Sequence, residues 1–154
     1  MSLANKHLVL ITGPTCSGKS QLARAIALEF NGQIINADSM QVYSDLQIIT
    51  SRPRTEDLLS VKHRMYGYLD GSKRGNVASW HKLAIKEISQ SNSEETLPIV
   101  VGGTGLYLKA AEYGLSSIPD VPGIVRAEAT SLYSEYGGEG CLERLREQDP
   151  VIAD

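Results

Sequence analysis

The sequence predicts an α/β fold in which a parallel sheet carries helices on both faces, giving three layers. Three apolar runs of strand length alternate with stretches whose apolar residues recur at helical spacing. A glycine-rich turn lies between the first apolar run and the first helical stretch. Because strands that are joined through helices pair in parallel, with right-handed crossovers, this order predicts a parallel sheet.

The first predicted strand and the first predicted helix flank this turn. Leu8–Ile11 is an uninterrupted apolar run, which is typical of a buried parallel strand. The turn that follows completes the pattern G-x-x-x-x-G-K-[ST], in the strand–turn–helix context that the pattern requires. The fold is therefore predicted to be P-loop NTPase-like. The helix Lys19–Phe30 has its apolar positions at Leu22, Ala23, Ile26, Ala27 and Phe30.

The turn predicts a binding site for a diphosphate or a nucleotide phosphate, formed by Gly13, Pro14, Thr15, Cys16, Ser17, Gly18, Lys19 and Ser20. Backbone N–H groups of such a turn converge with the positive end of the following helix, and together they attract phosphate. Lys19 adds a positive charge, and the Ser20 hydroxyl can coordinate Mg²⁺, the expected cofactor. We interpret Cys16 as a small turn residue, the alternative being a thiol activated by the loop.

The second and third predicted strands bring further polar residues to the same edge of the sheet. Gln33–Ala37 leads directly to Asp38, and Leu97–Val101 leads to the glycine-rich segment Gly102–Gly105. Residues just beyond the carboxyl ends of parallel strands line the ligand crevice, so we expect Asp38 beside the phosphate loop. The helices around the third strand are predicted as Val77–Ser91, with Val77, Trp80, Ala84 and Ile88 on one face, and Leu106–Tyr113.

Two stretches lack a clear strand signal. Ser44–Asn76 is irregular, and a segment of this length predicts a binding loop or lid. Ile118–Pro122 resembles a linker, after which helices are predicted at Gly123–Tyr136 and Gly140–Gln148. With three strands only, the sheet is predicted to be incomplete and to leave an apolar strand edge and face uncovered, so that the chain alone is either marginally stable or hides this surface by self-association.

Composition limits the class of protein. The chain has 154 residues, of which 42% are hydrophobic and 21% charged, with a net charge of −3. These values predict a globular protein. No apolar run approaches the roughly 20 residues that span a bilayer, and the N-terminus lacks a signal-peptide core, so we expect a cytoplasmic protein without a membrane partner. The basic residues between Arg52 and Arg74 are either solvated surface or an RNA contact.

At this point the chain resembles the tRNA dimethylallyltransferase family, also called tRNA isopentenyl transferases. The phosphate loop, Ile35–Tyr43 and Val101–Ala110 carry the resemblance, and the second and third blocks are the more specific. Weaker similarity lies in Thr50–Pro53, in His63–Gly67 and in Ile118 through Arg126. The blocks follow the family's order over about residues 7–150.

The resemblance implies that a dimethylallyl group passes from dimethylallyl diphosphate to N6 of the adenosine 3′-adjacent to the anticodon, with a tRNA anticodon stem-loop as partner. Asp38 would be the general base, and Lys19 and Ser20 would complete the catalytic set. The alternatives for Asp38 are a Mg²⁺ ligand and a structural turn cap. The tRNA-binding residues implied by the resemblance are Asp38, Ser39, Met40, Gln41, Thr104 and Arg126, of which Arg126 is alternatively an exposed helix residue.

The chain also departs from the family. Ile49 stands where the family has glycine, and family members continue well past Asp154. We therefore expect a fragment of a longer protein or a shortened product, with residues 1–118 as a partial core and 119–154 as the beginning of a helical insertion. A non-catalytic diphosphate-binding remnant, a small P-loop kinase and a prenyltransferase acting on free adenine nucleotides are the alternatives.

Overall fold

The computed structural model describes residues 7–116 and 121–154, which fall into two compact units, Met1–Leu115 and Ser116–Asp154. The predicted boundary at 118/119 and most of the predicted linker Ile118–Pro122 lie outside the described residues. Each unit is therefore described by itself.

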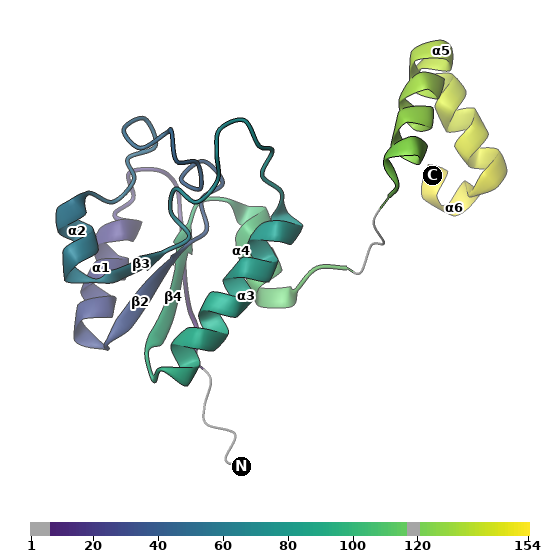
Figure 1. The fold of residues 1–154 in the computed structure, drawn as a ribbon. Coiled ribbons are helices and arrows are strands. Elements are labelled where there is room, and N and C mark those ends of the chain that lie inside the picture. The colour runs from purple at the N-terminus through teal and green to yellow at the C-terminus, as the bar shows by residue number, and fades with distance from the viewer. Residues whose placement is uncertain (1–6, 117–120) are drawn as a thin grey trace. The chain divides into compact units, whose positions relative to one another are not determined.

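The first unit is built on a parallel sheet of four strands (Figure 1). The strands are β1 (Val9–Thr12), β2 (Gly32–Asn36), β3 (Lys62–Arg64) and β4 (Leu97–Gly102), in the order β1-β4-β2-β3. In the register of the sheet, Ile99 of β4 pairs with Val9 on one side and Ile34 on the other. The parallel α/β fold predicted from the sequence is confirmed.

The prediction of only three strands was wrong, and so was the assignment of all of Ser44–Asn76 to irregular structure. This segment contains α2 (Thr55–Ser60) and β3, which pairs with β2. Both elements are too short for periodicity to reveal them, and β3 consists of polar residues because it is an edge strand. The edge of β2 is thus covered, whereas β1 has no outer neighbour strand among the described residues.

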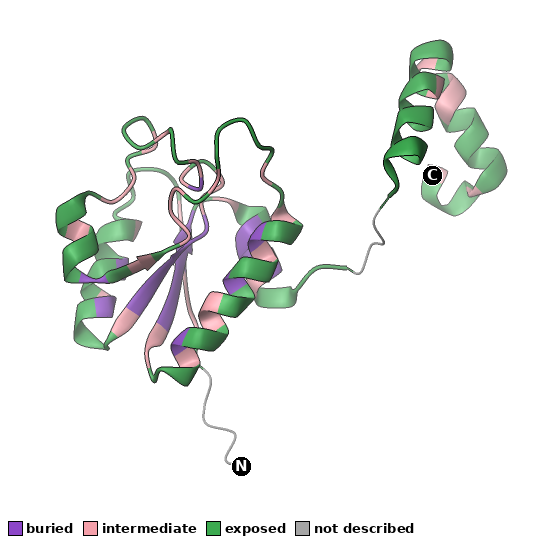
Figure 2. Cartoon of the chain, in the orientation of Figure 1, coloured by how far each residue is buried: buried purple, intermediate pink, exposed green. Residues whose placement is uncertain are grey.

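Helices cover both faces of the sheet and give two apolar clusters, as the burial pattern in Figure 2 shows. Because side chains alternate along a strand, Ile34 and Ile99 face α1 (Lys19–Glu29). The neighbouring residues Ile35 and Val100 belong to the opposite cluster, with α3 (Val77–Ser93) and α4 (Gly105–Tyr113). On that face the rings of Trp80 and Tyr107 stack with centroids 4.4 Å apart.

Two of the residues predicted for the apolar face of α1 are not in the core. Leu22 and Phe30 are 54% and 63% exposed, whereas Ala23 and Ala27 are buried. The helix lies so close to the sheet that a Cβ on Gly32 would stand 2.9 Å from the Cα of Ala27. Small residues therefore form the closest contact, Ile26 packs partly buried against the same cluster, and Leu22 and Phe30 turn outward.

The second unit is helical. α5 (Gly123–Gln148) contains a break at Gly137, where φ is +66°, so the predicted interruption at Gly137–Gly138 is confirmed. α6 (Pro150–Ala153) follows, with the Asp149 carboxylate accepting the Ile152 N–H at 3.1 Å. No residue of α5 is buried (Figure 2). Within residues 7–116 and 121–154, none of the helices has both the length and the apolar character to cross a bilayer.

The carboxyl ends of β2 and β4 meet at Gly102. A Cβ on this residue would lie 2.2 Å from the carbonyl carbon and oxygen of Ala37 and 2.8 Å from the Asp38 nitrogen. These neighbours are backbone atoms, so no side-chain rotation could make room. By contrast, the nearest atom to a Cβ on Gly103 would be the Gly13 carbonyl oxygen at 3.8 Å, an ordinary contact distance.

We predict that Gly102→Ala lowers the free energy of unfolding by about 3 kcal/mol, because the backbone at Ala37 must shift. Urea unfolding measures this loss. Gly103→Ala is the matched control, with an expected change below about 1 kcal/mol. Equal stability of the two variants would show that the strand ends are farther apart in solution than in the structure.

Candidate functional site

The phosphate loop Gly13–Ser20 joins β1 to α1 and is largely exposed. Gly18 stands immediately before α1 with φ +85°, and Cys16 has φ +62°. These left-handed residues curl the loop back over the helix start, and Cys16 acts there as a turn residue with an exposed thiol. The Lys19 ammonium folds across the loop and donates to the Pro14 carbonyl. The cation and the start of α1 thus lie together at the loop.

Ser20 lies in the first turn of α1 and is exposed. Its hydroxyl has no hydrogen bond to any residue that the structure describes, so it is available to a ligand. Among residues 7–116 and 121–154, no group of three or more His, Cys, Asp or Glu side chains could hold a metal. The Ser20 hydroxyl is an oxygen ligand of the kind that Mg²⁺ takes in proteins, together with phosphate oxygens and water.

Asp38 begins the turn after β2, and its carboxylate has a structural role. Oδ1 accepts the N–H groups of Met40 at 2.8 Å and Gln41 at 3.4 Å. The turn-cap alternative therefore holds for this oxygen. Oδ2 forms no hydrogen bond within the described part of the chain, which leaves one carboxylate oxygen for a reacting group.

Two phenols lie near the Asp38 carboxylate. Burial, and then the Asp38 charge, raise the pKa of Tyr66. Burial, and then Tyr43 and Asp38, raise the pKa of Tyr107. Both phenols are consequently protonated at neutral pH, so neither competes with Asp38 as a proton acceptor.

The end of β4 connects Asp38 to the phosphate loop. β4 lies between β1 and β2, with Gly103 beside the Gly13 carbonyl on one side. On the other side, the Thr104 N–H donates to the Ala37 carbonyl at 3.3 Å, and Thr104 Oγ1 accepts the Ser39 N–H at 2.9 Å. The three segments that carry the sequence blocks therefore meet at one edge of the sheet.

The residues predicted to bind tRNA have different surroundings. Met40 is 51% exposed and open to a ligand. Gln41 donates through Nε2 to the Thr50 carbonyl at 2.8 Å, and the hydroxyls of Thr104 and Ser39 bond to each other at 3.2 Å. Arg126 is exposed on α5, in the second unit.

Asn36 is a site residue that the sequence analysis missed. It is fully buried at the end of β2, its Oδ1 accepts the Asp38 N–H at 2.9 Å, and its Nδ2 donates to the Asp38 carbonyl at 3.0 Å. Trp80 Nε1 donates in turn to the Asn36 carbonyl at 2.9 Å. A polar residue inside the apolar run Ile34–Ala37 was the available signal.

Arg52 was also missed as an organiser of the site. Its Nη1 donates to the carbonyls of Tyr43 at 2.8 Å and Ser44 at 3.4 Å. The guanidinium occupies the space beside Gly67, where any Cβ would clash with it and where φ is +57°. Gly67 donates to the Gln41 carbonyl at 2.9 Å, so this arginine fixes the loop that follows Asp38.

The fold and the glycine-rich loop define an α/β protein of the P-loop NTPase-like class. The family model described as IPP transferase matches residues 41–154. The chain belongs to the IPP transferase family. It is similar to the tRNA dimethylallyltransferase of Gluconobacter oxydans, with 47% identity over 148 residues that cover 96% of this chain and 45% of the relative. For the enzyme of the same name from Rhodospirillum rubrum the identity is 48%, with coverages of 96% and 45%.

Solved structures give the same fold. The tRNA isopentenylpyrophosphate transferase of Bacillus halodurans matches with a TM-score of 0.72 at 32% identity, covering 96% of this chain and 49% of that protein. A eukaryotic dimethylallyltransferase described as acting on tRNA matches with a TM-score of 0.80 at 30% identity, with coverages of 96% and 37%. The chain spans about half the length of the curated relatives it matches.

We predict that Lys19→Met weakens binding of inorganic pyrophosphate by about tenfold or more, because a charge-assisted contact is lost. Isothermal titration calorimetry in Mg²⁺ buffer measures the affinity. Lys86→Met, on the exposed side of α3, is the control and leaves the affinity unchanged. Pyrophosphate binding that is insensitive to Lys19 would mean that the loop is not the binding site.

Proposed function

We propose that this chain supplies the diphosphate loop and the general base of a tRNA dimethylallyltransferase. The reaction transfers the dimethylallyl group of dimethylallyl diphosphate to N6 of the adenosine 3′-adjacent to the anticodon. The observation that carries the proposal is the junction at the end of β4, which links the loop at Gly13 with the turn at Asp38 in a member of the IPP transferase family. A tRNA substrate makes the cytoplasm the expected location.

The phosphate loop stabilises the leaving group in this proposal. As the C–O bond of the donor breaks, charge develops on the diphosphate, and preorganised N–H groups and Lys19 are suited to neutralise it. The Ser20 hydroxyl and the phosphate oxygens would hold Mg²⁺, which supplies additional positive charge when bound. The loop thus binds the donor and lowers the barrier to its ionisation.

Asp38 removes the proton from the acceptor. The N6–H of neutral adenine is a very weak acid and becomes acidic only when the new C–N bond places positive charge on the nitrogen, so proton removal follows the formation of that bond. The C–O bond to the diphosphate breaks and pyrophosphate leaves, the C–N bond to N6 forms, and the N6 proton passes to the Asp38 carboxylate. The free Oδ2 is the oxygen for this step, while Oδ1 keeps the turn rigid.

The acceptor adenine must leave its stack to reach a buried carbon. Exposed Met40 offers an apolar surface to a flipped ring. Gln41 is held through its amide nitrogen, so its amide oxygen is the group that would accept a hydrogen bond from the adenine edge. Ser39 and Thr104 fix the turn, and Arg126 is proposed to contact the tRNA from the helical unit.

The kinase alternative finds less support. A phosphate-loop kinase generally uses an acidic residue at the end of an apolar strand to hold Mg²⁺. β4, the strand beside β1, ends instead at Gly102 and is followed by Gly103. A non-catalytic remnant would bind diphosphate without turnover, so a transfer assay separates it from the enzyme.

We predict that Asp38→Asn abolishes transfer of label from dimethylallyl diphosphate to an unmodified tRNA and leaves the melting temperature unchanged. An asparagine Oδ1 accepts the same two N–H groups, but the amide cannot take up a proton. Asp38→Ala should lose both activity and stability, since the turn cap is removed.

Asp45→Asn is the matched control, because its Oδ2 likewise accepts a backbone N–H, from Gly71 at 2.9 Å. It should retain transfer activity. Full activity of Asp38→Asn would overturn the proposal that Asp38 is the general base, and would leave this residue with its structural role alone. Absence of transfer in the unmodified chain, with pyrophosphate binding intact, would favour the non-catalytic remnant.

A further inference from the structure

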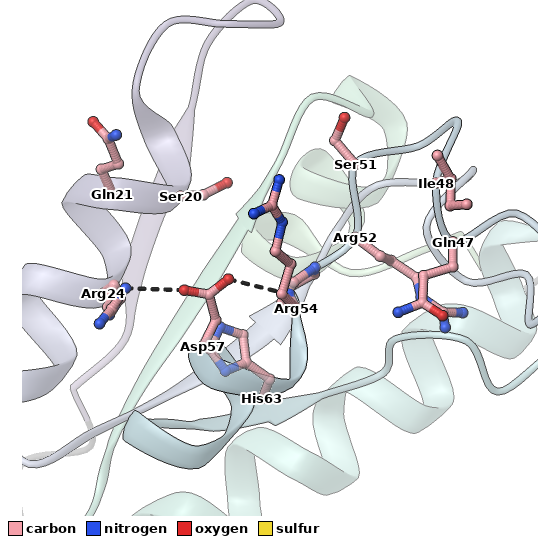
Figure 3. Close-up of a pocket in the computed structure, with 11 residues that line it drawn as sticks. Ser20, Gln21, Arg24, Gln47, Ile48, Ser51, Arg52, Arg54, Asp57 and His63 are labelled. Atoms are coloured by element: carbon pink, nitrogen blue, oxygen red, sulfur yellow. Dashed lines mark hydrogen bonds and ion pairs between the residues drawn. The ribbon is translucent and has the colours of Figure 1, made fainter.

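A pocket adjoins the phosphate loop at Ser20. It has a volume of about 550 Å³, within the range of small-molecule sites. One wall is the start of α1, including Ser20, and the other consists of the loop before α2, α2 itself and β3. Its charged side chains are Arg24, Arg52, Arg54 and Asp57 (Figure 3). We refer to it as the arginine pocket.

The positive charge of the arginine pocket is only partly compensated. Asp57 is the single carboxylate that lines it. Its Oδ1 accepts Arg24 Nη1 at 2.9 Å, and its Oδ2 accepts the backbone N–H of Arg54 at 3.1 Å. Within residues 7–116 no carboxylate pairs with the guanidinium of either Arg52 or Arg54. Two arginine charges thus share the pocket without a counterion, in a chain whose net charge is −3.

The two unpaired arginines differ in their other contacts. Arg52 donates to the carbonyls of Tyr43 and Ser44, which uses part of its donor set for the loop. The Arg54 guanidinium has no hydrogen bond to a described residue, and in Figure 3 it extends across the pocket toward Ser20. A free guanidinium fork matches two oxygens of a phosphate group.

The position of Ser20 decides which anion fits. Ser20 belongs to the phosphate loop and also lines the arginine pocket, so a phosphate held by the loop has the pocket as its neighbour. A ligand with two linked phosphates spans both places, whereas a single phosphate fills only one of them. Repulsion between the uncompensated guanidinium groups adds to the gain from binding an anion between them.

We propose that the arginine pocket is a second phosphate subsite, in which Arg54 binds the outer phosphate of a diphosphate whose inner phosphate occupies the loop. This inference rests on the proposed function, because it assigns one phosphate of the prenyl donor to the phosphate loop and the other to the arginine pocket. It identifies Arg54 as a residue that selects diphosphates over monophosphates.

Calorimetric titration with inorganic pyrophosphate and with inorganic phosphate tests the subsite, in Mg²⁺ buffer and without tRNA. Arg54→Gln should weaken pyrophosphate binding by about tenfold and phosphate binding by less than about twofold. Arg54→Glu should weaken pyrophosphate binding further, because it reverses the charge. Arg74→Gln, an exposed arginine that does not line the pocket, is the matched control and should bind both anions like the unmodified chain.

Pyrophosphate affinities that are equal for Arg54→Gln and Arg74→Gln would overturn the inference. So would an Arg54→Gln variant that keeps its pyrophosphate affinity but loses affinity for an anticodon stem-loop RNA, because the pocket would then serve RNA. The melting temperature of each variant checks its folding. These titrations measure anion binding and no transfer reaction. Their outcome is therefore independent of the transfer assay: the subsite can be confirmed in a chain that does not modify tRNA, and refuted in a chain that does.

Discussion

The approach of β4 to β2 at Gly102 is the contact on which the site depends. With no side chain at that position, the backbone of β4 passes directly beside Ala37 and places Thr104 where its hydroxyl accepts the Ser39 N–H. The same strand end lies beside the Gly13 carbonyl of the phosphate loop. A glycine outside the phosphate loop therefore determines the relation between that loop and the proposed base.

The apolar core is connected to this junction through a buried hydrogen-bond network. Trp80 is fully buried, stacks on Tyr107 and donates to the carbonyl of Asn36. Asn36 in turn holds both the N–H and the carbonyl of Asp38. Because a buried hydrogen-bond network of this kind is costly to leave partly unpaired, it fixes the backbone of the proposed base more tightly than packing alone would.

The sequence predicted those parts of the molecule whose signals are local. The phosphate loop has a fixed spacing, and the buried strands are apolar runs, so both were predicted from short windows. β3 escaped prediction because an edge strand of three polar residues has no apolar pattern. The outward turn of Leu22 and Phe30 depends on how closely α1 approaches Gly32, which is a tertiary distance and has no signature in the helix itself. Asn36 was a polar residue in an apolar run, but its bonds to Met65 and Trp80 are set by the fold, as is the bond of Arg52 to Tyr43.

We propose that the loop and the Asp38 turn form one site through the end of β4, and amide NMR during pyrophosphate titration in Mg²⁺ tests this most directly. We expect the signals of Gly13–Ser20, of residues 37–41 and of residues 102–104 to shift together with one dissociation constant. Shifts confined to the loop, with residues 37–41 and 102–104 unmoved at saturation, would contradict it.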